Sequence, residues 1–88
     1  MPAARGPDVA RGRELYFAVC GVCHGADGKT WNGVDLTTIK DKWKPEDLIA
    51  FIKKPRAPMP PPFPSPLDEQ NLRDIRDIAA FVMQWKAP

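Results

Sequence analysis

The chain has 88 residues, enough for one small domain, and 43% of them are hydrophobic, which excludes a disordered composition. A domain of this size often gains stability from a disulfide, a metal or a cofactor, because it buries only a modest fraction of its surface. Its net charge of +2 is too small to predict nucleic-acid binding. No apolar run approaches the roughly 20 residues of a membrane span, so we expect none.

The N-terminal part predicts a short tail followed by a helix. Residues 1–7 contain two prolines, a glycine and no apolar periodicity, so we expect a flexible tail before a domain spanning residues 8–88. Asp8 can cap a helix that runs towards Cys20. Residues 21–44 contain four glycines and no sustained alternation of apolar and polar positions, which indicates a loop.

The second half predicts two more helices, separated by a proline-rich loop. Pro45 suits the first turn of a helix that Pro55 then ends. Residues 55–66 read PRAPMPPPFPSP, and seven prolines in twelve positions exclude both a helix and a central strand. Asp68 can cap a last helix that runs to about Trp85 with one broad apolar face. Three helices and no predicted strand indicate an all-α domain.

Scarce ligand-forming side chains are concentrated in the pentapeptide Cys20-Gly21-Val22-Cys23-His24, which holds both cysteines and the only histidine. Four interpretations compete. A disulfide at this spacing would close a very small loop and constrain the unfolded chain little. A thioredoxin-like redox pair expects a βαβ setting, and no strand is predicted here. A structural zinc site needs four nitrogen or sulfur ligands, and this stretch supplies three at most.

Covalent c-type haem is the fourth interpretation and the one we favour. Two thiols about one turn apart can each add to one vinyl group of the porphyrin, and the adjacent His24 can then bind the iron from one axial side. A second axial ligand would be a methionine thioether, because there is no second histidine. Met59 lies in the proline-stiffened loop, which suits a ligand, although it could instead fill a packing gap. We expect Met83 only to pack at the edge of a helix face.

These features resemble the class I cytochromes c over about residues 8–86. The matching segments are Gly12-x-x-Leu15-Tyr16 before Cys20-x-x-Cys23-His24-Gly25, then Gly33-Val34-Asp35-Leu36, Ala57-Pro58-Met59-Pro60, and Leu72 to Trp85. The resemblance implies a cytochrome c fold, with three to four helices wrapped around one covalent haem c. It also implies that the first and last helices cross at Gly12, where Tyr16 and Phe81 would pack.

The resemblance also suggests how the haem is seated. In the family, a proline carbonyl accepts a hydrogen bond from the proximal histidine, and Val34 stands at that position here. The carbonyl of Val34 can still accept this bond from His24, but the loop lacks the rigidity of proline. Trp31 and Trp43 could each donate an indole N–H to a haem propionate, as a tryptophan does in some family members, or each could be half-buried packing.

Ligation by His24 and Met59 would saturate the iron, so the expected function is one-electron transfer and not catalysis. The partner would be a redox protein. Basic residues in 40–56 could steer an acidic partner to the haem edge, or could simply be a solvated surface. These residues are Lys40, Lys42, Lys44, Lys53, Lys54 and Arg56. The resemblance implies assembly outside the bacterial cytoplasm, so we expect a periplasmic protein whose signal peptide is not part of this chain.

The specific pathway has four interpretations. The short form and the MPPPFP loop look similar to cytochrome subunits of periplasmic flavoprotein dehydrogenases such as p-cresol methylhydroxylase. That similarity predicts a carrier between a periplasmic dehydrogenase and a downstream acceptor. A freely diffusing carrier to a terminal oxidase or reductase fits equally well, as does a haem domain or subunit of a larger redox enzyme. A haem sensor or catalyst is also open, with Met59 displaceable.

Overall fold

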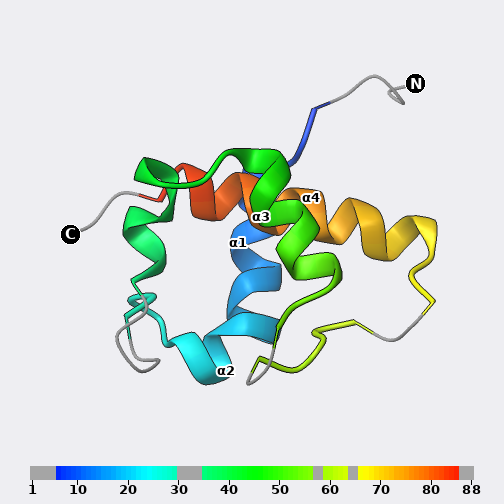
Figure 1. Ribbon diagram of the computed structural model, residues 1–88, viewed down its shortest axis with the longest axis horizontal. Helices are drawn as coiled ribbons and strands as arrows, with labels where there is room; N and C mark the ends of the chain where they lie inside the picture. The colour runs from blue at the N-terminus through cyan, green and yellow to red at the C-terminus, as the bar shows by residue number, and fades with distance from the viewer. Residues whose placement is uncertain (1–5, 30–34, 57–58, 64–65, 86–88) are drawn as a thin grey trace.

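The structure, a computed structural model, describes residues 6–29, 35–56, 59–63 and 66–85. This part of the chain contains four α-helices, a π-helical segment (η1) and a 3₁₀-helix (η2), and it contains no strand. The order is α1 (Val9–Leu15), η1 (Tyr16–Cys20), α2 (Gly21–His24), η2 (Leu36–Asp41), α3 (Pro45–Lys53) and α4 (Glu69–Met83) (Figure 1). The predicted all-α class is confirmed.

Helix α1 begins where the sequence predicted. The side chain of Asp8 accepts a hydrogen bond from the backbone N–H of Arg11 at 3.0 Å, which satisfies one of the free donors at the helix N-terminus. Segments α1, η1 and α2 then follow one another without a break, so the helical path continues beyond Cys20 as far as His24. It ends at Gly25, whose φ of 79° takes the chain out of the helix.

The prediction of a loop over residues 21–44 was wrong for two segments, α2 and η2. Helix α2 forms because Gly21 adopts an ordinary right-handed helical backbone and does not break the path. Helix η2 is started by Asp35, whose carboxylate accepts bonds from the backbone N–H of Thr37 at 2.9 Å and from its hydroxyl at 2.6 Å. Neither the helical backbone of Gly21 nor the cap at Asp35 produces an apolar periodicity, which is the main sequence indication of a helix.

The two later helices have the ends that their caps predict. Helix α3 starts at Pro45 and ends at Lys53, two residues before Pro55, because the position preceding a proline disfavours the helical backbone. At the start of α4, the side chain of Asp68 accepts from the backbone N–H of Asn71 at 2.7 Å. Helix α4 ends at Met83, slightly before the predicted Trp85.

Helix α1 packs directly against α4, and Gly12 makes this approach possible (Figure 1). A Cβ at Gly12 would lie 1.9 Å from the carbonyl oxygen of Asp77, so no larger side chain fits there without movement. Tyr16 is fully buried beside this crossing, with its ring centroid 5.6 Å from that of Phe81. Both the expected crossing and the expected aromatic pair are confirmed.

Polar side chains also join the two helices. The guanidinium of Arg11 pairs with Asp74 at 2.6 Å and with Asp77 at 2.9 Å, and the backbone N–H of Asp8 donates to the other oxygen of Asp77 at 2.9 Å. These bonds fix the register of α1 on α4. The apolar core lies next to them and consists of Tyr16, Leu48, Ile52, Ile75, Ile78, Ala79, Phe81 and Val82. Among the described helices, none has the length and apolar character needed to cross a membrane.

Candidate functional site

An apolar cavity of about 440 Å³ opens beside this core, within the size range of small-molecule and cofactor sites. It is bordered by η1 and α2, by η2, by α3 and α4, and by the proline-rich loop. Among the described residues that line it, only Arg56 carries a permanent charge. The lining consists of Tyr16, Val19, Cys20, Cys23, His24, Leu36, Ile39, Trp43, Leu48, Phe51, Ile52, Arg56, Met59, Pro60, Pro62, Ile78 and Val82.

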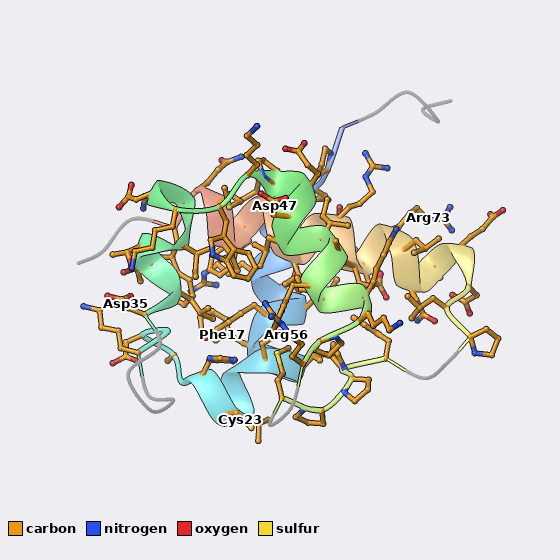
Figure 2. The ribbon with its side chains drawn as sticks, viewed as in Figure 1. Phe17, Cys23, Asp35, Asp47, Arg56 and Arg73 are labelled. Atoms are coloured by element: carbon orange, nitrogen blue, oxygen red, sulfur yellow. The ribbon has the colours of Figure 1, made fainter. Side chains whose placement is uncertain are left out.

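Both cysteines line this cavity, and both are free thiols. Cys20 ends η1 and Cys23 lies in α2, so about one helical turn separates them and both sulfur atoms can reach one edge of a flat ligand. Cys20 is partly buried, and burial, assisted by the nearby Cys23, raises its pKa to about 11. Cys23 is exposed, and Figure 2 shows it at the lower edge of the molecule, where α2 lies.

His24 lines the same cavity as the two thiols. Burial lowers the pKa of its imidazole, which favours the neutral form that binds metals. Its Nδ1 atom is buried and has no hydrogen-bond partner in the part of the chain that the structure describes. Buried polar atoms normally have partners, so the site calls for an acceptor at this nitrogen. The predicted acceptor, the carbonyl of Val34, lies outside the described residues.

The structure separates the two later methionines. Met59 lines the cavity together with His24, and its backbone N–H donates to the carbonyl of Arg56 at 3.1 Å. Met83 does not line the cavity and packs at the edge of the core instead. A soft thioether and an imidazole, distant in sequence, are thus brought to one cavity.

The tryptophans differ in what the structure shows of them. Trp43 lines the cavity and packs edge-on against Phe51, with ring centroids 5.5 Å apart. Trp31, the other predicted propionate donor, lies outside the described residues. Sequence reasoning missed Arg56 as a lining residue and placed it only in a docking surface. Its guanidinium lies 6.0 Å from the ring centroid of Phe51. The sequence feature that could have indicated this is its position three residues before Met59.

The residues present fit a haem. Two thiols, a neutral imidazole and a thioether share one apolar cavity, and this is the donor set of a c-type haem with two axial ligands. The competing interpretations gain no support. No three His, Cys, Asp or Glu side chains come together as a metal site within the described residues, as zinc would need, and the same residues include no strand for a thioredoxin-like setting.

Comparison with known proteins gives an independent result. A family model described as "Cytochrome C oxidase, cbb3-type, subunit III" matches residues 7–82, which include the Cys20–His24 motif and Met59. Neither a curated protein nor a solved structure matches the chain. The likeness to p-cresol methylhydroxylase therefore stays a prediction. The family match covers most of the chain, and the protein accordingly belongs to this family of c-type cytochrome domains, which carry haem c and act in electron transfer.

Proposed function

We propose that the protein is a one-electron carrier that holds one haem c covalently through Cys20 and Cys23, with His24 and Met59 as axial ligands. The observation that supports this most strongly is the convergence of these four side chains on a single apolar cavity. When bound, the haem supplies the Fe(III)/Fe(II) couple.

Each residue has a defined part in this proposal. The thiols of Cys20 and Cys23 would each add across a vinyl group of the haem, and the resulting thioethers would prevent its loss. His24 and Met59 would both ligate the iron, which would leave no open site for oxygen or peroxide and would keep the coordination the same in both oxidation states. The apolar lining excludes water, which disfavours the more highly charged ferric state. Methionine ligation acts in the same direction, so both effects raise the reduction potential.

Covalent attachment is tested by denaturing electrophoresis with haem staining. Wild-type protein made in a host with cytochrome c maturation machinery should keep its haem on the polypeptide after denaturation and extraction with acidified solvent. The double variant Cys20→Ala/Cys23→Ala should lose it, because neither thioether can form. The measured ratio of haem to protein should be one haem per chain, and a redox titration of the wild type should show a reversible one-electron step. Extraction of the haem from the wild type would refute the proposal.

The proposed partner is a redox protein with an acidic docking face. Lys53, Lys54 and Arg56 are exposed where α3 ends, and Arg56 also lines the cavity. Lys40 is less free to take part, because its ammonium donates to the carbonyls of Thr37 and Trp85. The positive charge near the cavity would raise the local concentration of an acidic partner and speed its approach.

Small charged probes test this surface without a known partner. Oxidation of the ferrous protein by ferricyanide, an anion, should slow several-fold in Lys53→Glu/Lys54→Glu at low ionic strength, and the difference should shrink at high salt. Arg73→Glu/Arg76→Glu is the matched control, because both arginines are exposed on α4, and Arg73 lies far from Cys23 (Figure 2). Equal slowing in both double variants would reduce the effect to net charge and contradict the proposed surface.

The location and the pathway complete the proposal. Cytochrome c domains typically lie outside the cytoplasm, and we place this one in the periplasm. Its electrons would come from a periplasmic dehydrogenase and pass to a downstream acceptor. The description of the matching family names a terminal oxidase, which makes an oxidase one acceptor to test.

A further inference from the structure

Tyr16 has a hydroxyl group that its packing role does not explain. The side chain is fully buried, and its ring lies in an aromatic cluster with centroids 5.3 Å from Phe17, 5.6 Å from Phe81 and 4.9 Å from Trp85. A phenylalanine ring would fill the same space. The hydroxyl donates its only hydrogen to the carbonyl oxygen of Gly25 at 2.7 Å, nine residues further along the chain.

Gly25 follows His24 directly, and its carbonyl belongs to the turn in which the chain leaves α2. Gly25 and Gly28 have φ values of 79° and 74°, backbone conformations that favour glycine. The carbonyl of Gly25 also accepts from the backbone N–H of Gly28, but at 3.3 Å, so the bond from Tyr16 is the shorter of the two.

The same turn is held from its other side. A Cβ at Gly28 would lie 3.0 Å from two ring atoms of Trp85, which shows that the indole lies close against the Gly28 backbone. The carbonyl of Gly28 accepts from the backbone N–H of Leu36 at 2.9 Å. The turn after His24 is therefore held between the hydroxyl of Tyr16 and the ring of Trp85, two residues of one aromatic cluster.

The support of this turn matters most for His24, the residue that directly precedes Gly25. Its Nδ1 atom has no hydrogen-bond partner among the described residues, and the expected acceptor, the carbonyl of Val34, lies outside them. The backbone on its C-terminal side, by contrast, is fixed by the short bond at Gly25. We propose that Tyr16 is a positioning residue, whose hydroxyl acts through the Gly25 carbonyl to set the orientation in which His24 binds the haem iron. This inference rests on the proposed ligation by His24.

The test is the Tyr16→Phe variant of the haem-loaded protein, studied by proton NMR. In the ferric state, the hyperfine shifts of the four haem methyl groups depend on how the axial ligands are oriented about the iron. We expect the pattern of these shifts to change in Tyr16→Phe. We also expect amide exchange at Gly28 and Leu36 to become up to about tenfold faster, the factor that one net hydrogen bond contributes, with a smaller change at Ile78 in the middle of α4.

Phe81→Leu is the matched control. It removes a ring of the same cluster without touching the hydroxyl or its acceptor. It should therefore speed exchange in α4 and in the turn alike, and it should leave the methyl pattern as in the wild type. A structural role of the Tyr16 hydroxyl would give Tyr16→Phe this same behaviour, and that result would overturn the inference.

A measurement on the wild type keeps the inference testable if the variant fails to fold. In the diamagnetic ferrous protein, the Tyr16 hydroxyl proton should give its own resonance and exchange slowly with water, as a buried donor at 2.7 Å requires. A hydroxyl proton in rapid exchange would overturn the positioning role while the haem-carrier proposal stands. A wild-type chain with no covalent haem would overturn both proposals together.

Discussion

Replacing Gly12 with alanine probes the crossing of α1 and α4 on which the fold depends. The added Cβ would lie 1.9 Å from the carbonyl oxygen of Asp77, 2.5 Å from its carbonyl carbon and 3.1 Å from the backbone nitrogen of Ile78. All three are backbone atoms of α4, so no side chain can rotate away to make room. The two helices themselves must therefore move apart.

The size of the effect follows from that distance. For the added Cβ to reach ordinary van der Waals contact with the Asp77 carbonyl oxygen, helices α1 and α4 would have to move apart by about 1.5 Å. Overpacking costs about 1–3 kcal/mol in general, and a rigid backbone neighbour places this case at the upper end. Alanine returns about 1 kcal/mol through its better helix propensity. We expect a net loss of about 2 kcal/mol in the free energy of unfolding, or a melting temperature lower by roughly 8–16 °C for a domain of this size.

Urea unfolding of the haem-loaded protein, followed by far-ultraviolet circular dichroism, measures this loss. Gly6→Ala is the control, because nothing lies within 4 Å of a Cβ at Gly6. The control should be as stable as the wild type. A Gly12→Ala protein that is as stable as the wild type, or more stable by the helix-propensity gain, would refute the reasoning about the crossing.

Three further predictions concern charged and titrating groups. Arg11→Ala should lower the free energy of unfolding by about 1–2 kcal/mol at pH 7, because it leaves Asp74 and Asp77, with side chains only 12% exposed, facing each other without a cation. The 41% exposure of the Arg11 side chain keeps the loss moderate. Arg11→Lys, which keeps the positive charge, should lose less, and an equal loss in the two variants would contradict the electrostatic cause. Burial raises the pKa of Tyr16, so the unfolded tyrosine ionises near pH 10 before the folded one does. The free energy of unfolding should therefore fall as the pH rises above about 10. Urea unfolding at pH 9 to 11 should show a shallower fall in Tyr16→Phe than in the wild type. Parallel plots of unfolding free energy against pH for the two proteins would contradict this. Hydrogen bonds from a neighbouring threonine lower the pKa of Asp35, so its stabilisation is present above about pH 4 and lost as the pH falls further. Acid unfolding of Asp35→Asn should lack that loss, and identical acid profiles would contradict the assignment.

The parts of the fold that local chemistry decides could be predicted from the sequence. Asp8 and Asp68 satisfy helix N-termini within three residues, and Pro45 and Pro55 limit α3 through steric effects on their immediate neighbours. The haem motif is equally local, because one turn of helix contains both thiols and the imidazole. Met59 could be predicted as the second ligand from composition, because the chain has no second histidine to complete the coordination.

Contacts between distant residues could not be predicted in the same way. Arg11 and Asp77 are 66 positions apart, and no short pattern shows that they meet. The sequence resemblance paired Tyr16 with Phe81, but it contained nothing to show that the hydroxyl would find the carbonyl of Gly25. The position of Arg56 at the cavity likewise depends on how α3 packs against the rest of the domain.

The central claim is that Met59 and His24 together bind the iron of a covalently held haem. Ferric haem with a methionine sulfur ligand shows a weak far-red absorption band, so the most direct measurement is that spectrum in the wild type, in Met59→Ala and in Met83→Ala. The band should be present in the wild type and in Met83→Ala, because Met83 packs at the core edge and does not line the cavity. It should be lost in Met59→Ala. A wild-type protein without the band, or a band that survives in Met59→Ala, would contradict the account.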